Sequence, residues 1–248
     1  MKNRYKITFS YDGTNYFGYA KQVNEVSIQG EIERCLCCIL NENITIYASG
    51  RTDKGVHALK QVADFETSKT INDKNKFLYS LNKMINKDIY VKSINKVSSN
   101  FSSRLDVKEK TYLYLINIGD YNPLKRNFEL YENRIINYPL MVEASKIFVG
   151  KHDFKNFTSK DEDQDDFIRE IFKIELKKNS KNISIKFSGN GFMRYEIRKI
   201  VGVLLEVGKN KLTINDVKKL FDTKEREIVN YQAEPHGLYL YDVKYFKK

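Results

Sequence analysis

The sequence predicts an α+β fold of two fused ferredoxin-like halves that share an extended, mainly antiparallel sheet with a central basic cleft. Three observations predict it. Strands and helices follow the order β-α-β-β-α-β in the first half, the second half loosely repeats this order, and no Pro- or Gly-rich linker separates the two. We therefore divide the chain into residues 1–106 and residues 107–248.

The first half begins with a half-buried strand, because apolar residues alternate with polar ones over Lys6–Tyr11. Ser27 is a good N-cap for a helix that follows, in which apolar residues recur at helical spacing from Ile28 to Leu40. The remaining elements expected here are a short strand over Ile44–Ala48, a strand over Gln61–Phe65, a helix over Phe77–Ile85 and a strand over Ile89–Val97. RNA-recognition modules share this arrangement.

The second half is expected to contain several strands and three helices. Asn137 and Pro139 open a helix that Gly150 closes, and Thr213 with Asp216 forms a capping box. The other elements are strands over Thr111–Ile118, Phe128–Ile136, Ile168–Lys177, Ile183–Phe187 and Leu238–Tyr245, and an apolar helix over Phe192–Val207. The acidic stretch Asp161–Asp166 is interpreted as a solvated loop.

Composition and charge restrict the function. The chain of 248 residues carries a net charge of +11, which favours a polyanionic partner, either nucleic acid or an anionic membrane. The apolar stretch Ile200–Leu205 is too short to cross a bilayer, and no apolar run follows the N-terminal charges as in a secretory signal. No predicted helix combines a basic face with an exposed aromatic face, so a membrane-surface protein is disfavoured.

The cysteines and histidines give little support for a metal site. Cys35 and Cys38 have C-x-x-C spacing, but a zinc site normally needs a second pair. Cys35, Cys37 and Cys38 lie on a predicted helix, which favours buried thiols that pack as small apolar groups. An odd, clustered set of three also argues against a secreted disulfide framework and for a reducing, cytoplasmic setting. The three histidines are His57, His152 and His236.

The sharpest local feature is the run Gly50-Arg51-Thr52-Asp53-Lys54-Gly55-Val56-His57, between two predicted strands. Two glycines allow a tight turn and a close approach to a ligand. Two cations flank one carboxylate, which favours its ionised form, as a nucleophile or base requires. An ordinary turn with a surface ion pair explains the same residues, so this pattern alone leaves both interpretations open.

Two further sets of residues are candidates. Tyr112 and Tyr114 point to one face of a predicted strand, where they either pack in the core or stack on a base. Arg198 lies among apolar residues of a predicted helix, and a buried guanidinium needs a carboxylate partner. The local sequence does not identify that partner.

Eight short motifs occur in one order along nearly the whole chain. They are Tyr11-Asp12-Gly13 with Tyr16 and Gly18, Gln29, Gly50-Arg51-Thr52-Asp53 with Gly55-Val56-His57, Phe101 with Arg104, Lys110-x-Tyr112-x-Tyr114, Gly150-x-His152-Asp153-Phe154 with Phe157, Arg198-x-Ile200-Val201-Gly202, and His236-Gly237-Leu238-Tyr239-Leu240. In these motifs the chain resembles the bacterial tRNA pseudouridine synthase A (TruA) family. Such enzymes isomerise uridine to pseudouridine in RNA.

The resemblance implies roles for individual residues. Asp53 would be the catalytic aspartate, Tyr112 would pack against the target base, and Arg198 would pair with the aspartate. Arg51 would help to hold the flipped nucleotide, and Leu238 would line the uracil pocket. Lys54 and His57, in the same loop motif, are expected to contact substrate. The first half would thus carry the catalytic loop, and the second would complete the active-site cleft.

The resemblance also implies the setting of the reaction. No metal, nucleotide or redox cofactor is expected, the substrate would be the anticodon arm of tRNA at positions 38–40, and the enzyme would be a cytoplasmic homodimer with no membrane association. Gly18-Tyr19-Ala20-Lys21-Gln22 departs from the usual G-W-Q-x-Q, and Ile85-Asn86-Lys87 replaces the usual Leu-Pro. Two alternatives stay open: a paralogue that modifies another RNA such as ribosomal RNA, and a non-catalytic RNA-binding protein on the same scaffold.

Overall fold

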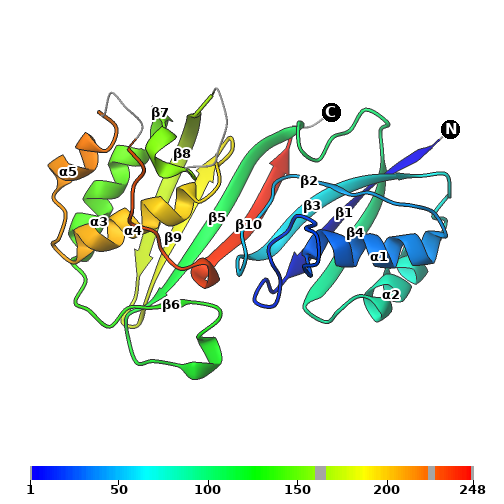
Figure 1. The fold of residues 1–248 in the computed structure, drawn as a ribbon, viewed down its shortest axis with the longest axis horizontal. Helices are drawn as coiled ribbons and strands as arrows, with labels where there is room; N and C mark the ends of the chain where they lie inside the picture. Colours follow the sequence, from blue (N-terminus) through cyan, green and yellow to red (C-terminus); the bar gives the residue numbers. More distant parts are fainter. Residues whose placement is uncertain (1, 160–165, 223–226, 247–248) are drawn as a thin grey trace. The chain divides into compact units, whose positions relative to one another are not determined.

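The chain folds into two compact units. The computed structural model describes residues 2–159, 166–222 and 227–246. Unit 1 comprises Met1–Lys108 and Tyr239–Lys248, and unit 2 comprises Glu109–Leu238 (Figure 1). The end of the first segment of unit 1 is close to the boundary that the sequence analysis places after residue 106. The last strand belongs to unit 1 from Tyr239 onward, whereas the predicted division assigns the whole strand to the second half.

Unit 1 contains a mostly antiparallel sheet. Strand β1 (Asn3–Tyr11) pairs antiparallel with both β3 (His57–Thr67) and β4 (Ile89–Val97), and β2 (Tyr47–Ala48) pairs antiparallel with β3. Strand β10 (Leu238–Tyr245) runs parallel to the start of β3, with Tyr239 opposite His57. The element order β-α-β-β-α-β is confirmed.

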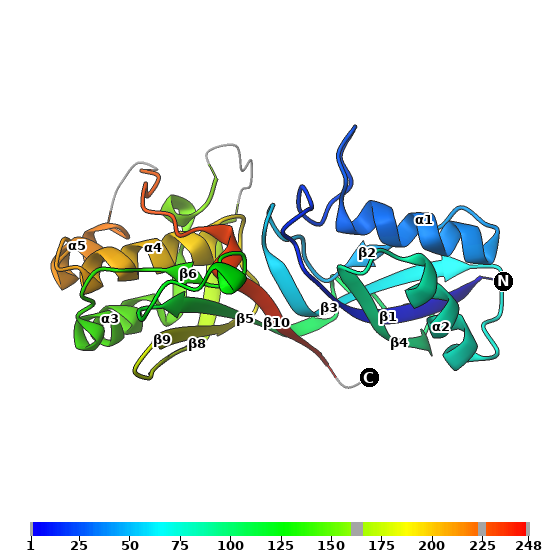
Figure 2. The same ribbon diagram turned by 90° about the horizontal axis from the view of Figure 1, so that it is seen from below.

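Helices α1 (Ile28–Leu40) and α2 (Lys74–Met84) lie side by side in unit 1 (Figures 1 and 2). The predicted N-cap of α1 is confirmed, because the Ser27 hydroxyl accepts a hydrogen bond from the Gly30 N–H at 3.2 Å. The alternation expected for the first strand is also confirmed. Its buried residues are Tyr5, Ile7, Phe9 and Tyr11, and together with the apolar residues of the helices they form the core of this unit.

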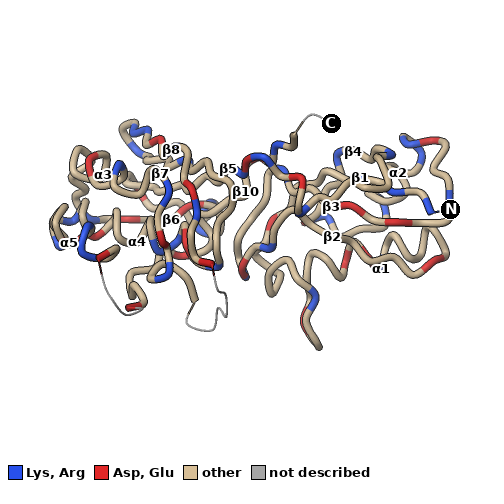
Figure 3. The backbone as a smooth tube through the Cα atoms, turned by 90° about the horizontal axis from the view of Figure 1, so that it is seen from above, with Lys and Arg blue, Asp and Glu red and all other residues tan. Residues whose placement is uncertain are grey.

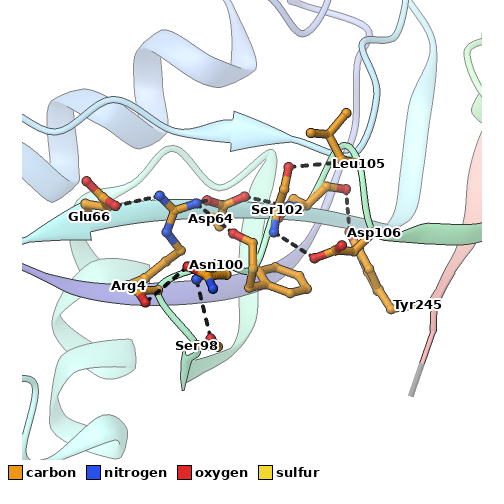
Figure 4. A network of polar contacts seen from close by, with 12 residues as sticks. Arg4, Asp64, Glu66, Ser98, Asn100, Ser102, Leu105, Asp106 and Tyr245 are labelled. Atoms are coloured by element: carbon orange, nitrogen blue, oxygen red, sulfur yellow. Dashed lines mark hydrogen bonds and ion pairs between the residues drawn. The ribbon is translucent and has the colours of Figure 1, made fainter. Parts of the chain in front are cut away.

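A polar network fixes the segment that follows β4 (Figure 4). The guanidinium of Arg4 donates to the carboxylates of Asp64 at 3.1 Å and Glu66 at 2.5 Å, and to the carbonyl of Phe101 at 2.6 Å. The buried carboxylate of Asp64 also accepts from the Ser103 N–H at 2.7 Å. The buried carboxylate of Asp64, paired with the Arg4 cation and bonded to the Ser103 N–H, therefore holds the segment firmly against the sheet.

The antiparallel strands of unit 2 follow one another in the order β5 (Val107–Asn117), β9 (Asn182–Gly189), β8 (Ile168–Lys178) and β7 (Gly150–Asp153), and they belong to the same ten-stranded sheet as the strands of unit 1, as the sequence analysis expects. Figure 2 shows the helices of unit 2 together on one side of β8 and β9. They are α3 (Tyr138–Ser145), α4 (Glu196–Gly208) and α5 (Ile214–Lys219). Four 3₁₀ turns complete the described elements: Pro123–Lys125, Lys146–Phe148, Lys155–Phe157 and Pro235–Gly237. The predicted α+β class is therefore confirmed.

Several predicted boundaries in unit 2 are wrong. The strand expected over Phe128–Ile136 shrinks to β6 (Leu130–Tyr131), which runs parallel to β5, and Ile135 is 95 % exposed. No pattern of alternation marked the short strand β7. Helix α4 begins at Glu196 rather than at Phe192, because Tyr195 adopts a left-handed backbone conformation with φ of +66°.

The cysteines differ in exposure. Cys35 is buried, Cys37 is half-buried and Cys38 is exposed. The expectation of buried thiols is therefore right for Cys35 and wrong for Cys38, which is exposed. Within the described ranges, no helix has the length and apolar character to cross a membrane. The predicted acidic loop Asp161–Asp166 lies, except for its last residue, outside the described residues.

Candidate active site

The loop between β2 and β3 carries the motif that the sequence analysis singles out. Its start is fastened to β3 by three hydrogen bonds. The Ser49 N–H donates to the Val62 carbonyl at 2.8 Å, the Ser49 hydroxyl donates to Gln61 Oε1 at 2.7 Å, and Gln61 Nε2 donates to the Gly50 carbonyl at 2.9 Å. Gln61 is fully buried. The loop therefore leaves the sheet from a fixed point.

The segment that follows β1 packs directly against this loop. The Tyr19 N–H donates to the carbonyl of Thr52 at 3.0 Å. A Cβ atom at Gly13 would lie 2.1 Å from the Val56 carbonyl oxygen, and one at Gly18 would lie 2.8 Å from the Thr52 carbonyl oxygen. Gly18 also has φ of +92°, which disfavours any side chain. Both glycines are thus required for the close backbone approach.

A buried tyrosine hydroxyl supports the centre of the loop. The hydroxyls of Tyr11 and Thr52 lie 2.8 Å apart, within hydrogen-bond distance. Burial raises the pKa of Tyr11 to about 12, and its hydrogen bonds to Thr52 and Gln61 only partly oppose this shift. Tyr11 is therefore neutral near pH 7, so it adds no negative charge beneath the loop.

Asp53 is half-buried at the turn of the loop. Its carbonyl accepts a hydrogen bond from the Val56 N–H at 3.1 Å, and Gly55 closes the turn with φ of +77°. Arg51 and Lys54 are exposed on either side of it. The ammonium of Lys54 lies 3.7 Å from the centre of the Phe17 ring, a cation–π contact that links the loop to the segment after β1.

His57, the first residue of β3, is buried. Its Nδ1 accepts from the Gly13 N–H at 3.1 Å, and the carboxylate of Asp12 lies 3.1 Å from the same nitrogen. Its ring stacks on Tyr239 with centroids 4.8 Å apart. His57 therefore connects the end of the loop to the segment after β1 and to β10.

Unit 2 positions the other candidate residues. Tyr112, on β5, is largely buried, and its ring meets Phe192 edge to face with centroids 5.4 Å apart. Tyr114 points to the same face and donates to the Glu234 carbonyl at 2.7 Å. A Cβ atom at Gly237 would lie 2.8 Å from the Tyr114 ring, so the chain passes closely over it before Leu238, which is buried at the start of β10.

Arg198 lies in the first turn of α4 and is largely buried. Its Nε donates to the Ala233 carbonyl at 2.9 Å. In the amide orientation that satisfies both side chains, Oε1 of Gln232 accepts from Nη2 at 2.9 Å and from Nη1 at 3.2 Å. The guanidinium carbon lies 5.4 Å from the centre of the Tyr195 ring. Three residues on two segments thus fix the plane of this guanidinium.

The segment 227–234, which we call the strap, has no regular secondary structure but is fastened at several points. The Val229 N–H donates to the Asn156 carbonyl at 2.8 Å, the Ala233 N–H donates to the Arg198 carbonyl at 2.9 Å, and the Lys199 ammonium donates to the Val229 carbonyl. A Cβ atom at Gly202 would lie 2.7 Å from the strap backbone. The strap therefore lies tightly against α4.

The structure thus divides the predicted site residues between the units. Unit 1 brings together Arg51, Asp53, Lys54 and His57, and unit 2 contains Tyr112, Arg198 and Leu238. The sequence did not point to Gln232 or Tyr195: Gln232 lies in an irregular segment, and no sequence pattern marks a tyrosine with a left-handed backbone.

The described residues include no group of three or more His, Cys, Asp or Glu side chains that could hold a metal ion. Lys and Arg occur along both units (Figure 3).

Comparison with known proteins connects these residues to one family. A family model described as tRNA pseudouridine synthase matches residues 7–106 and 144–246. Asp53 and Arg198 lie within the matched segments, whereas Tyr112 lies between them.

Curated relatives match over nearly the whole chain. The tRNA pseudouridine synthase A of Anoxybacillus flavithermus is 37 % identical over 98 % of both chains. The tRNA pseudouridine synthase A 2 of Bacillus cereus is 36 % identical over 98 % of this chain and 100 % of the relative. The tRNA pseudouridine synthase A of Caldicellulosiruptor bescii is 38 % identical over 96 % of this chain and 98 % of the relative. This chain belongs to the tRNA pseudouridine synthase family.

Proposed function

We propose that this chain isomerises uridine to pseudouridine in the anticodon arm of tRNA, at positions 38–40, with Asp53 as the catalytic residue. The observation that carries the proposal is the placement of Asp53, in a chain of this family, on a tightly fastened loop between two exposed cations. A carboxylate held on a rigid loop can be presented to a bound nucleotide with little loss of conformational entropy.

The reaction exchanges one glycosidic bond for another. The N1–C1′ bond breaks, the uracil rotates, C5 bonds to C1′, the proton on C5 goes to solvent, and N1 gains a proton. Asp53 serves either as the nucleophile that attacks C1′ or as the base that starts a glycal route, and both need its ionised form. A base in a duplex stack cannot be reached, so the target nucleotide is flipped out.

The other site residues have distinct proposed roles. Tyr112 packs against the uracil and takes part in the proton transfer at C5. The cation of Arg198 pairs with the ionised Asp53, and Leu238 lines the uracil pocket. Arg51 holds the flipped nucleotide through its exposed guanidinium, which suits bidentate contact with phosphate.

Lys54 and His57 complete the proposed set of substrate-binding residues. Lys54 is exposed and can contact phosphate. His57 is buried, so its proposed contribution to substrate binding is indirect: it accepts the Gly13 N–H and thereby holds the end of the loop in place. The net charge of +11 supports binding of a polyanion.

We further propose that the enzyme is a cytoplasmic homodimer in which one tRNA contacts both subunits. The support is the similarity to the family over nearly the whole chain. Sedimentation equilibrium of the purified protein, alone and with tRNA, tests the assembly. A mass of twice the 29.2 kDa of the chain is expected, and a monomer at micromolar concentration in both samples would refute the dimer.

The test of function is direct mapping of pseudouridine. The purified protein is incubated with unmodified transcripts of tRNA and, separately, with fragments of ribosomal RNA, and carbodiimide-dependent stops of reverse transcription are located. Stops at positions 38–40 that require the protein are expected. Stops only in ribosomal RNA fragments would identify a paralogue with another substrate, and binding of RNA without any stops would identify a non-catalytic RNA-binding protein.

A further inference from the structure

We propose that Gln232 is a positioning residue that fixes the guanidinium of Arg198 without neutralising its charge. This inference rests on the proposed function, in which the cation of Arg198 faces the carboxylate of Asp53. Gln232 lies on the strap, is exposed, and has no catalytic group of its own. Its role follows from what its amide oxygen contacts.

Gln232 and Ala233 accept hydrogen bonds from three of the N–H groups of the Arg198 guanidinium. Arginine has five N–H donors in one plane. The Ala233 carbonyl takes the one on Nε at 2.9 Å, and the amide oxygen of Gln232 takes one from Nη2 at 2.9 Å and one from Nη1 at 3.2 Å. These acceptors therefore fix the plane in which the other two N–H groups also lie.

Tyr195 restrains the same plane from its face. Its ring centre lies 5.4 Å from the guanidinium carbon of Arg198 and 4.7 Å from that of Arg194. Its φ of +66° is uncommon for an aromatic residue and costs free energy. The strained backbone of Tyr195 thus places its ring against the face of the Arg198 guanidinium, while Gln232 contacts the edge of the same group.

The backbone under Gln232 is fixed although its side chain is exposed. A Cβ atom at Gly202 would lie 2.8 Å from the Gln232 nitrogen, so the strap is in direct contact with α4. The next residue, Ala233, is buried and exchanges hydrogen bonds with Arg198 through both its N–H and its carbonyl. The amide oxygen is thus presented from a rigid support.

The chemical type of the acceptor matters. A neutral amide orients the guanidinium and leaves its positive charge for the carboxylate of the active site. A carboxylate at this position would bind both Nη groups as a bidentate ion pair, which is stronger and would compensate the charge. The geometry therefore predicts that a glutamate at position 232 holds Arg198 well but supports catalysis poorly.

The test compares Gln232→Glu and Gln232→Ala with the wild type and with Asn230→Asp, in the full-length protein. Asn230 is exposed on the same strap, so Asn230→Asp adds the same charge two residues away. Tritium release from tRNA carrying 5-tritiated uridine gives kcat and KM, and thermal unfolding gives Tm. We expect kcat to fall about tenfold in Gln232→Ala and about a hundredfold in Gln232→Glu, with KM within about twofold of the wild type.

The Tm of Gln232→Glu should equal or exceed that of the wild type, and Asn230→Asp should keep its kcat. A structural role alone would make activity follow stability, so a fully active Gln232→Glu would overturn the inference. A kcat of Gln232→Glu equal to that of Asn230→Asp would overturn it as well. A wild-type protein without tritium release would instead refute the proposed function, so the two failures are distinguishable.

Discussion

The loop that carries Asp53 and the strap that holds Arg198 are both irregular segments, but they are fixed in different ways. The loop is held by close backbone packing at Gly13 and Gly18 and by side chains from outside it, above all Gln61 and Tyr11. The strap is held by side chains of α4, above all Arg198 and Lys199, which donate to its carbonyls. The residues that hold the loop are therefore other than Asp53, whereas Arg198, the candidate functional side chain next to the strap, itself helps to hold the strap.

This difference has a consequence for substitutions. A side chain added beneath the loop should destabilise the whole of unit 1, because backbone cannot move aside easily. A change at the strap should affect the orientation of Arg198 more than the stability of unit 2. The following predictions test this contrast, from the largest expected effect to the smallest.

Gly13→Ala should have the largest effect on stability. Its methyl group would lie 2.1 Å from the Val56 carbonyl oxygen, so the loop or the segment after β1 must shift. We expect the free energy of unfolding to fall by about 3 kcal/mol, measured by urea denaturation. Gly191→Ala is the matched control, because nothing lies within 4 Å of a Cβ atom there. Equal stabilities of the two variants would contradict the proposed close packing of the loop.

Gly202→Ala should separate activity from stability. Its Cβ atom would lie 2.7 Å from the Tyr231 carbonyl carbon, which pushes the strap away from α4. Alanine favours the helix by about 1 kcal/mol, so the net loss of unfolding free energy should be only about 1–2 kcal/mol. The kcat for tritium release should fall further than this loss explains, since the acceptors of Arg198 move. Unchanged kcat would show that the strap does not orient the guanidinium.

Glu196→Gln should change how the stability of the protein depends on pH. Glu196 is fully buried; its Oε2 accepts from the Met193 N–H at 2.8 Å, and its Oε1 has no hydrogen-bond partner among the described residues. Burial raises the pKa of Glu196 to about 8. The folded protein then holds a proton that the unfolded chain releases near pH 4.5, so this group lowers the free energy of unfolding as the pH rises from about 5 to 8.

The slope can reach about 1.4 kcal/mol per pH unit for one proton. Urea denaturation of both proteins at several pH values in this window measures it. Glu196→Gln removes this titrating group, so it should show a flatter profile than the wild type. Parallel profiles would mean that Glu196 is ionised in the folded protein.

Lys54→Ala should have the smallest effect. The ammonium of Lys54 lies over the Phe17 ring at the surface, so its loss should change stability by less than about 1 kcal/mol. If Lys54 contacts a phosphate, the slope of log Kobs against log salt for tRNA binding should shrink by about one. Lys83→Ala is the control, because this exposed lysine lies over the Tyr79 ring in the same way. Equal slopes for both variants would remove Lys54 from the binding surface.

The same contrast explains what could be predicted from the sequence. The cap at Ser27 and the capping box of Thr213 with Asp216 are local, and both are present in the structure. The strand expected over Phe128–Ile136 fails because pairing depends on a distant strand, and only Leu130 and Tyr131 find partners on β5. Local patterns therefore predict helix ends better than strand extents.

In the candidate site, too, features that depend on neighbouring residues could be predicted from the sequence, and contacts between distant residues could not. The loop of Asp53 is marked by its own run from Gly50 to His57, whereas the glycines that let it pack closely, Gly13 and Gly18, lie in a separate motif after β1. The support of Arg198 comes from Gln232 and Ala233, more than thirty residues away along the chain. No spacing rule connects such residues, and the left-handed Tyr195 appears only in the folded backbone.

The central claim is that the carboxylate of Asp53 carries the isomerisation. Tritium release from tRNA with 5-tritiated uridine, measured for the wild type, Asp53→Asn and Asp88→Asn, tests it most directly. Asp88 is a half-buried aspartate of the same unit and serves as the matched control. We predict release by the wild type and Asp88→Asn, and none above background by Asp53→Asn, which should still bind tRNA. Release by Asp53→Asn at the wild-type rate would contradict the account.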